Sequence, residues 1–283
     1  MSAALQRDPD PADLLRLARS AAARAAEHLS GRRGPGPGGR PQVAATKSSP
    51  TDVVTEMDRS AEAMITGHIL AARPDDSLLA EEGGETSGRG RVRWIIDPLD
   101  GTVNYLYGLP DWAVSIAAEL DGVVAAGVVA IPARGEVFTA VAGGGAWLWA
   151  GPDDPVQLAC NRDVPLERAL VATGFGYSAA RRKVQGEVVA AVLPRVRDIR
   201  RGGSCAVDLC SVAAGRVDAY YERGVNPWDW AAGGLIATEA GARIGGLHGK
   251  PANSELMIAA GPGLYGELHD LLASQDPERD APQ

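Results

Sequence analysis

The fold is decided by residues 94–104, which read W-I-I-D-P-L-D-G-T-V-N. The apolar, β-branched start of this run predicts a short buried strand. The strand leads into two carboxylates, Asp97 and Asp100. Pro98 fixes φ between them, and Gly101 lets the backbone approach a ligand closely. A turn of this kind can direct both acids at one point.

Two acids at the end of a buried strand repel each other and lose hydration, so they need a compensating positive charge. A hard divalent cation such as Mg²⁺ prefers oxygen ligands and commonly binds substrate phosphate as well. The backbone N–H groups of Gly101 and Thr102 follow the acids and can face an anion. The alternative is an Asp-Pro turn in which one acid is a cap, because D-P and D-G pairs are common in turns. The complete run favours the metal site.

Composition limits the classes of function. The chain has 283 residues and a net charge of −8, which fits one large or two closely packed domains and argues against a nucleic-acid-binding surface. No stretch approaches the roughly 20 apolar residues of a membrane span, and no signal-peptide core is evident, so we expect a cytoplasmic protein. The three cysteines and four histidines show no ligand-like spacing. We therefore expect no disulfide framework, zinc site or histidine catalysis.

The first part of the chain predicts two helices around a segment rich in glycine and proline. Apolar positions recur at helical spacing from Asp10-Pro11 to Ser30-Gly31. Residues 31–41 are either a linker or a mobile flap beside a site. Residues 47–58, which read K-S-S-P-T-D-V-V-T-E-M-D, lead into the second helix. Asp58 is then either a helix cap or a site carboxylate.

The middle of the chain predicts strands. Residues 78–80 form a short apolar strand that ends before Glu81 and Glu82. Adjacent residues on a strand point to opposite faces, so only one of these glutamates can face the site. Residues 112–149 read as an antiparallel meander, and from about residue 170 strands and helices alternate. We expect an N-terminal α+β half, residues 1–160, that carries the metal motif, and a C-terminal α/β half, residues 161–283, that completes the site.

Two later segments place polar groups at helix starts. Gly202-Gly203 precede Ser204, a predicted N-cap, so this segment is either an anion or hydroxyl site or an ordinary connection. Asp229 falls in the first turn of another helix, where the helix dipole stabilises a carboxylate by about 0.3–1 kcal/mol. Alternatively, Asp229 is a further metal-facing acid.

Five acids therefore stand at strand ends or helix starts: Asp58, Glu81, Asp97, Asp100 and Asp229. Acids without histidine or thiol partners select Mg²⁺ or Mn²⁺ over zinc. Two such ions can bind a phosphate ester, with one activating water and the other stabilising the leaving alkoxide. The pattern favours a metal-dependent phosphate-ester hydrolase.

Both motifs in order resemble the inositol monophosphatase family, and most closely its bacterial SuhB-type members. The first motif is D-P-L-D-G-T-V-N at 97–104, preceded by E-E-G at 81–83, and the second is W-D-W-A-A-G at 228–233. Residues 47–58 and Y-Y-E-R-G-V at 220–225 support the match, which spans about residues 12–272. The resemblance implies an α+β fold with layered αβαβα architecture, usually a homodimer. It also implies hydrolysis of phosphate monoesters with two to three Mg²⁺ ions, with Mn²⁺ as an alternative, and inhibition by Li⁺.

The resemblance further implies metal ligands. The first ion would be held by Glu81, Asp97 and the carbonyl of Leu99. The second would be held by Asp97, Asp100 and Asp229, and a weaker third ion would lie near Glu81.

It also implies catalytic and substrate-binding roles. Thr102, paired with Asp58, would orient the attacking water beside Glu81. The amides of Gly101 and Thr102 would hold the phosphate. The substrate would also contact these positions: Asp100, Gly203, Ser204, Cys205, Glu222 and Asp229.

Two positions depart from the usual family pattern. Tyr105 stands where many members have phenylalanine, and we expect it to keep the packing. Cys205 stands where alanine is common, which would tighten or repolarise the pocket. Glu222 could accept hydrogen bonds from two vicinal hydroxyls, and a site built to do so rejects substrates without them. The alternative for Glu222 is an exposed glutamate at a strand end.

The leading hypothesis is a Mg²⁺-dependent inositol-1-phosphate phosphatase whose substrate is a small phosphorylated polyol. The alternatives are a phosphatase for histidinol phosphate, fructose 1,6-bisphosphate or 3′-phosphoadenosine 5′-phosphate. A non-catalytic partner of the transcription machinery is a further alternative from another class. The acidic charge offers no direct nucleic-acid surface for that role.

Overall fold

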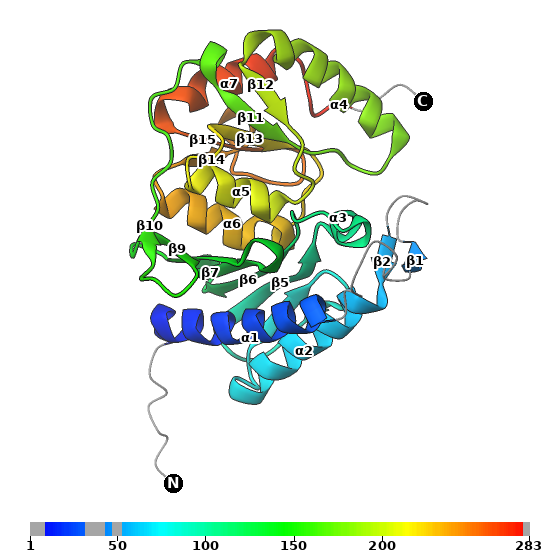
Figure 1. Ribbon diagram of the computed structural model, residues 1–283, viewed down its shortest axis with the longest axis vertical. Coiled ribbons are helices and arrows are strands. Elements are labelled where there is room, and N and C mark those ends of the chain that lie inside the picture. Colours follow the sequence, from blue (N-terminus) through cyan, green and yellow to red (C-terminus); the bar gives the residue numbers. More distant parts are fainter. Residues whose placement is uncertain (1–8, 32–42, 47–52, 280–283) are drawn as a thin grey trace.

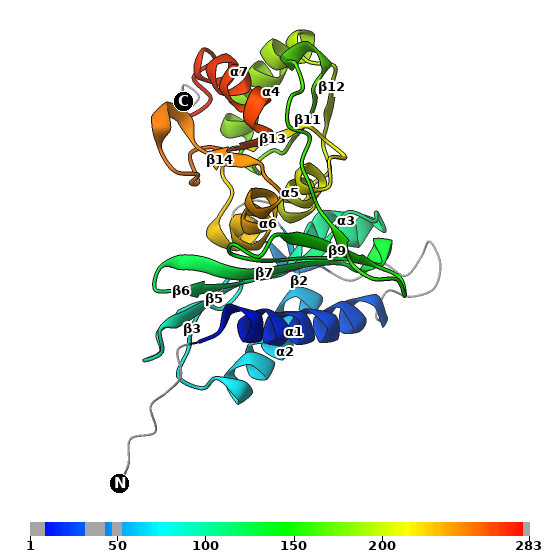
Figure 2. The same cartoon turned by 90° about the vertical axis from the view of Figure 1, so that its left-hand side faces the viewer.

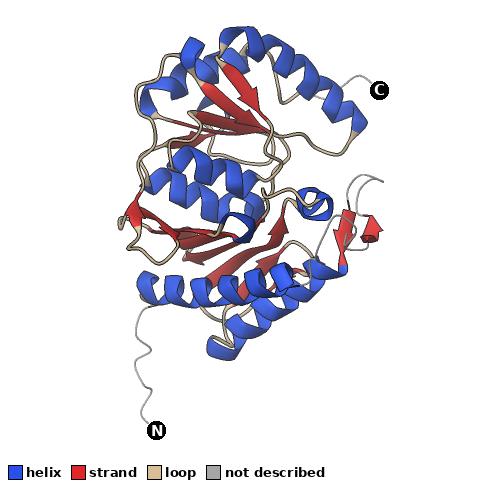
Figure 3. Cartoon of the chain, viewed as in Figure 1, coloured by secondary structure: helices blue, strands red, loops and turns tan. Residues whose placement is uncertain are grey.

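Helices and sheets alternate in five layers in the computed structural model, which describes residues 9–31, 43–46 and 53–279 (Figure 1). Two helices, an eight-stranded sheet, two helices, a five-stranded sheet and two further helices follow one another (Figure 3). This is the α+β fold with αβαβα layering that the sequence predicts.

The first layer consists of α1 (Pro11–Gly31) and α2 (Glu56–Ala72), which cover one face of the larger sheet (Figure 2). Most of the buried residues of α1 are alanines, so its backbone packs closely against the sheet. The opposing core includes Trp94, Trp112 and Ile116, each at most 1% exposed. The first predicted helix is confirmed.

The larger sheet has the strand order β10-β9-β8-β7-β6-β5-β3-β4. Its strands have these bounds: β3 (Ser77–Ala80), β4 (Gly84–Thr86), β5 (Val92–Asp100), β6 (Ala113–Leu120), β7 (Val123–Ile131), β8 (Glu136–Val141), β9 (Ala146–Ala150) and β10 (Val156–Gln157). Only β3 and β5 run parallel. The predicted meander is confirmed, and Asp121 and Gly122 in one of its turns both have positive φ (52° and 86°). The short strands β4 and β10 were not predicted, because two or three exposed residues carry no alternating pattern.

Strand β5 is longer than predicted. It includes both carboxylates and ends at Asp100, whereas the predicted apolar strand covered Trp94 to Ile96 and led into them. Asp97 pairs with Ser115 of β6 and Asp100 with Ala113, with a register shift between the two pairs. This bulge accommodates the D-P-L-D segment at the C-terminal end of β5. A short helix, α3 (Thr102–Tyr107), follows Gly101 and was also not predicted.

The smaller sheet has the order β12-β11-β13-β15-β14. Its strands have these bounds: β11 (Leu170–Thr173), β12 (Asp198–Arg200), β13 (Ala219–Glu222), β14 (Arg243–Gly245) and β15 (Met257–Ala260). Strand β11 is parallel to both neighbours, whereas β15 is antiparallel to both of its own. All except the short edge strand β14 match predicted strands.

The middle layer consists of α5 (Cys205–Ala213) and α6 (Pro227–Glu239), which lie between the two sheets (Figure 1). Every residue of α5 is buried, so no face of this helix is exposed to solvent. The outer layer consists of α4 (Ala179–Val192) and α7 (Pro262–Ala273). The middle layer brings the starts of α5 and α6 to the ends of the larger sheet's strands.

Several smaller features complete the description. A two-stranded sheet pairs β1 (Val43–Thr46) with β2 (Val53–Thr55). The described part of the chain has four short 3₁₀ helices: Pro132–Arg134, Leu166–Arg168, Leu193–Arg195 and Leu247–Gly249. The three cysteines are free and buried, in keeping with the behaviour of an unpaired cysteine as a small apolar residue.

Some predictions fall outside what the structure describes. Residues 32–41 of the glycine- and proline-rich segment lie outside the described residues, as do Lys47 and the side chain of Thr55. The division into halves at residue 160 stays a prediction. Within the described ranges, no helix combines the length and the apolar character that crossing a membrane requires.

Candidate active site

The site begins where β3 and β5 end side by side. These parallel strands pair Ala80 with Ile96, so Glu81 and Asp97 follow at neighbouring positions. The N–H of Glu81 donates to the carbonyl of Ile96 at 3.2 Å, which continues the pairing by one residue. The adjacent ends therefore place two predicted carboxylates together, as the sequence suggested.

Asp97 is almost completely buried, with 1% of its surface exposed. Its Oδ1 accepts a hydrogen bond from the N–H of Leu99 at 2.9 Å. Burial raises the pKa of Asp97 well above its usual range, and repulsion from Glu81, Asp100 and Asp229 raises it further. Asp97 therefore lies close enough to Glu81, Asp100 and Asp229 for their charges to interact.

Asp100 connects the larger sheet to the middle helical layer. Its Oδ2 accepts hydrogen bonds from the hydroxyl of Ser204 at 2.6 Å and from the N–H of Ala206 at 2.7 Å. Ser204 is the N-cap of α5, as predicted. Burial raises the pKa of Asp100 to about 6, while these two hydrogen bonds oppose that rise.

Asp229 reaches the same region from the first turn of α6. Its Oδ2 accepts a hydrogen bond from the N–H of Asn226 at 2.6 Å. Burial raises the pKa of Asp229 well above its usual range, followed by repulsion from Asp100. Asp229 therefore has a capping contact and also faces the other acids, so the two interpretations of this residue are compatible.

Asp58 and Thr102 meet across 44 positions of sequence. Oγ1 of Thr102 lies 2.9 Å from Oδ1 of Asp58 and 3.1 Å from the carbonyl of Leu99. Since a hydroxyl has a single proton, these two acceptors compete for it. Asp58 is fully buried at the start of α2. The pairing of Thr102 with Asp58 is thus present in the structure.

Gly101 has the left-handed conformation at the turn between β5 and α3, with φ 88°. A Cβ at this position would lie 2.8 Å from the carbonyl oxygen of Asp111 and 3.3 Å from Cβ of Ser204. Both the conformation and the close approach therefore require glycine.

A second polar group lines the region beyond α5. Glu222 ends β13 and accepts a hydrogen bond from the hydroxyl of Tyr220 at 2.8 Å. Burial raises the pKa of Glu222 to about 7. Cys205 is buried nearby, and burial also raises the pKa of its thiol, with further contributions from Asp100, Asp229 and Glu222. Glu222 is therefore not an exposed residue at a strand end.

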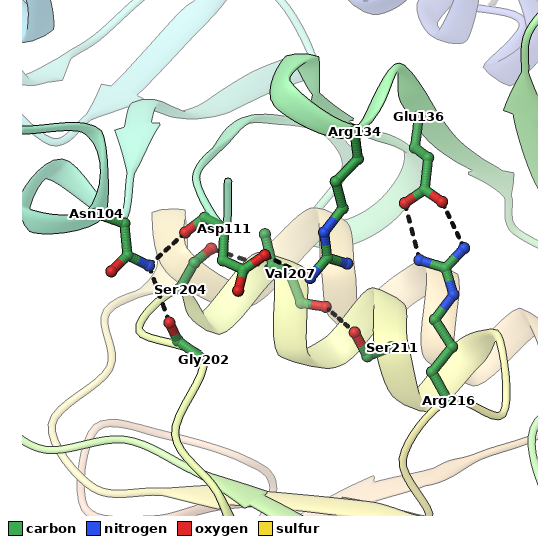
Figure 4. A network of polar contacts seen from close by, with 9 residues as sticks. All are labelled: Asn104, Asp111, Arg134, Glu136, Gly202, Ser204, Val207, Ser211 and Arg216. Atoms are coloured by element: carbon green, nitrogen blue, oxygen red, sulfur yellow. Dashed lines mark hydrogen bonds and ion pairs between the residues drawn. The ribbon is translucent and has the colours of Figure 1, made fainter. Parts of the chain in front are cut away.

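Sequence patterns missed several residues that support these groups. Asn104 donates to the carbonyl of Asp111 at 2.5 Å and to that of Gly202 at 2.9 Å, which ties α3 to the segment before α5 (Figure 4). Arg134 pairs with the side chain of Asp111 in the same network. The positive charge of Arg201 partly opposes the rise in the pKa values of Asp100 and Glu222. These links join distant segments, so no local motif reveals them.

Tyr105 keeps the packing that the sequence predicts. Its ring packs edge-on against Trp112 with 5.0 Å between centroids. Its hydroxyl donates to the carbonyl of Leu29 at 2.8 Å, so the extra oxygen relative to phenylalanine has a buried partner.

The donor set fits a hard divalent cation in type and charge. Burial and mutual repulsion raise the pKa values of Asp97, Asp100 and Asp229, and a bound cation would offset that cost. Among the described residues, no group of three or more His, Cys, Asp or Glu side chains is arranged to hold an ion as it stands. Oxygens of Asp97, Asp100 and Asp229 accept backbone or hydroxyl hydrogens instead.

Comparison with known proteins identifies the family. The model of the inositol monophosphatase family matches residues 10–279. The chain belongs to the inositol monophosphatase family. Membership in this family makes it a phosphatase, as the sequence predicts.

Individual members of the inositol monophosphatase family match over most of the chain. Inositol-1-monophosphatase SuhB of Mycobacterium tuberculosis is 45% identical over 276 residues, which covers 92% of this chain and 93% of the relative. The solved structure of Mycobacterium tuberculosis SuhB has a TM-score of 0.80 at 42% identity and covers 96% of this chain and 100% of the other. A relative named Nus factor SuhB, from Escherichia coli, is 40% identical over 209 residues, or 73% of this chain and 76% of its own length.

Proposed function

We propose that the chain is a Mg²⁺-dependent phosphatase that hydrolyses inositol 1-phosphate to inositol and phosphate. The observation that carries the proposal is the convergence of Glu81, Asp97, Asp100 and Asp229, where burial and mutual repulsion raise the pKa values of Asp97, Asp100 and Asp229. Such a cluster needs cations, and phosphate esters are the usual substrates that share Mg²⁺ with protein carboxylates. The 45% identical relative from Mycobacterium tuberculosis is named for the same substrate.

The proposed ligands are those that the family resemblance implies. Two to three Mg²⁺ ions, or Mn²⁺ in their place, would supply positive charge for the phosphate and acidity for the attacking water. The first ion would be held by Glu81, Asp97 and the carbonyl of Leu99, and the second by Asp97, Asp100 and Asp229. A third would lie near Glu81.

The chain's own residues would orient the reactants. The hydroxyl of Thr102, set between Asp58 and the carbonyl of Leu99, would hold the attacking water in line with the phosphorus atom. The amides of Gly101 and Thr102 would bind the phosphate. Water attacks phosphorus, the ester P–O bond breaks, and the leaving oxygen takes a proton to give free inositol.

Glu222 would select the polyol. Its carboxylate is buried beside Cys205 and Tyr220, where it could accept hydrogen bonds from two neighbouring hydroxyls. A substrate without those hydroxyls would leave Glu222 with the Tyr220 hydroxyl as its donor and without the two substrate hydrogen bonds, which is costly. Gly203, Ser204 and Cys205 would line the same pocket. We also propose inhibition by Li⁺, a homodimer and a cytoplasmic location.

Steady-state phosphate release would test this proposal. Inositol 1-phosphate, histidinol phosphate and fructose 1,6-bisphosphate would each be assayed with Mg²⁺ and with Mg²⁺ plus Li⁺. We expect preference for inositol 1-phosphate and loss of activity with Li⁺. An Asp97→Asn preparation controls for contaminating phosphatase. Preference for another ester would reject the polyol pocket, and absence of Mg²⁺-dependent release from every ester would reject the enzyme.

A second candidate function is a non-catalytic role in transcription. The observation that favours it is the 40% identical relative from Escherichia coli that is named a Nus factor. Complementation would separate the two roles. A strain that lacks this chain would be supplied with the wild type or with Asp100→Asn. Full rescue by a variant with no hydrolytic activity would favour the non-catalytic role, whereas failure of that variant would favour catalysis.

A further inference from the structure

Glu62 is a buried carboxylate on α2 that no sequence motif singles out. It is 8% exposed and lies four residues after Asp58. Residues four apart share one face of a helix, so α2 presents both acids toward the strand ends. Asp58 meets Thr102, whereas Glu62 meets the turn that follows β3.

The carboxylate of Glu62 accepts hydrogen bonds from the backbone of that turn. Its Oε2 accepts the N–H of Glu82 at 2.8 Å, and the N–H of Gly83 also donates to it. A Cβ on Gly83 would lie 2.7 Å from Oε1 of Glu62, so the backbone passes directly against the carboxylate. The turn is thereby anchored at two points, to β5 through the bond from Glu81 to Ile96 and to α2 through Glu62.

The charge of Glu62 is balanced by these amides. No Lys, Arg or His forms an ion pair with Glu62 among the residues that the structure describes. Burial raises the pKa of Glu62, with added repulsion from Glu82 and Glu81, while the amides of Glu82 and Gly83 lower it. A buried carboxylate is costly unless hydrogen-bond donors satisfy it. Glu62 and these amides therefore hold one another in place.

We propose that Glu62 is a positioning residue that orients Glu81 toward Asp97 and thereby sets the metal affinity of the site. Glu81 immediately precedes the two residues whose amides Glu62 holds. Freeing those amides would let the Glu81 side chain leave the shared environment of Asp97, Asp100 and Asp229. The inference rests on the proposed metal-dependent function, but it concerns binding of the ion and not the choice of ester. Partners that orient metal ligands typically change affinity by about 10–100-fold when removed.

The experiment compares three variants of the full chain. Glu62→Ala removes the acceptor, and Glu62→Gln keeps one acceptor oxygen without the charge. Glu56→Gln is the matched control, because Glu56 is exposed on the same helix. Mn²⁺ binding to metal-free protein would be measured by electron paramagnetic resonance. Amide hydrogen exchange at Glu82 and Gly83 and thermal unfolding without metal would be recorded in parallel.

We expect Glu62→Ala to weaken Mn²⁺ binding by about tenfold or more and to speed exchange at the two amides. Glu62→Gln should fall between Glu62→Ala and wild type, and Glu56→Gln should match wild type. At saturating metal, kcat of Glu62→Ala should recover to within about threefold of wild type, because the acids themselves are intact. A purely structural role would instead lower thermal stability and leave the Mn²⁺ affinity of the folded protein unchanged.

Unchanged Mn²⁺ affinity in both Glu62 variants would overturn the inference, whatever their rates of hydrolysis. If Glu62→Ala fails to fold, Glu62→Gln decides by the same criterion. Failure of the proposed function looks different, because the wild type would then release no phosphate from any ester while its Mn²⁺ binding still responded to Glu62. A wild-type chain that binds no Mn²⁺ would reject both.

Discussion

Oδ2 of Asp100 accepts a 2.6 Å hydrogen bond from the hydroxyl of Ser204, although 104 positions separate the two residues. The same hydroxyl oxygen accepts the N–H of Val207 at 3.2 Å and so caps α5. One side chain therefore starts a helix of the middle layer and holds a carboxylate of the larger sheet. Stability and chemistry are linked at this contact.

Replacing Ser204 should affect both properties. Ser204→Ala loses the cap, which costs about 1 kcal/mol of unfolding free energy, and leaves Asp100 with the N–H of Ala206 as its remaining donor at this contact, which should lower kcat/KM by about tenfold. Ser204→Thr keeps the hydroxyl and should retain most of both. Denaturant unfolding and steady-state kinetics would measure the two effects. Ser211→Ala is the control, because that hydroxyl donates only to the carbonyl of Val207 within α5 (Figure 4). Equal effects of the two alanine variants on kcat/KM would contradict this interpretation.

Asp97→Asn should abolish activity more completely than Asp58→Asn. Asp97 interacts with three other acids, whereas Asp58 accepts a hydrogen bond from the Thr102 hydroxyl. Loss of an oriented proton acceptor typically lowers the rate by about 100-fold or more, so Asp58→Asn should keep a measurable residual activity. Initial rates at saturating Mg²⁺, with Mn²⁺ affinity in parallel, would compare the variants. Equal losses would count against the assignment of Asp97 to both ions.

Gly174→Ala should damage substrate selection and spare the metal site. Gly174 follows β11 beside Glu222, and a Cβ there would overlap the Glu222 carboxylate. The displaced carboxylate should raise KM for inositol 1-phosphate by about tenfold, which is the effect of one lost charged hydrogen bond. Hydrolysis of a phosphate ester without neighbouring hydroxyls should change little. Gly186→Ala, in α4 with open space around it, should leave KM as in the wild type.

KM for inositol 1-phosphate should fall as pH rises through about 7. Burial raises the pKa of Glu222 to about 7, and the ionised form is the better acceptor for hydroxyls. Since such a group is only about one-tenth ionised at pH 6, KM should decrease by about tenfold between about pH 6 and pH 8. Kinetics at fixed ionic strength would show this, and Glu222→Gln should flatten the Glu222-dependent part. An identical profile in that variant would assign the pH dependence to the substrate phosphate.

Ionisation of Glu222 should favour substrate binding but lower the free energy of unfolding. An acid whose pKa is higher in the folded than in the unfolded state favours folding when protonated. The free energy of unfolding of the metal-free chain should therefore fall as pH rises from about 4.5 to 7 through this group. Glu222→Gln should reduce that slope in thermal unfolding.

The sequence predicted the parts of the site that local motifs carry. Asp97, Asp100 and Gly101 lie in one run of the sequence, which strand β5 and its bulge carry. The layers were also accessible, because the meander and the later alternation of strands and helices have clear periodicity. The metal and substrate roles came from the family resemblance, and for this chain they stay predictions.

What the sequence could not show depends on tertiary contacts. Glu62 acts on backbone amides 20 positions away, and Asn104 acts on a carbonyl 98 positions away. Every residue has a backbone carbonyl and nearly every residue a backbone N–H, so the residue types in the sequence do not indicate which of these groups a distant side chain will contact. Gly174 matters only because Glu222 packs against it from the neighbouring strand. The missed strands β4, β10 and β14 are too short to show a pattern, and their pairing is set by the sheets they border.

The layered arrangement also determines when the site can form as the chain is synthesised. Glu81, Asp97 and Asp100 emerge from the ribosome well before α5 and α6, which bring Ser204 and Asp229 to them. Until the middle layer packs against the larger sheet, these acids remain accessible to water, and their ionisation carries little cost. The cluster of acids is therefore completed only when the middle layer packs. The proposed metal binding would then report that the chain has been made at least through α6 and that this layer has packed.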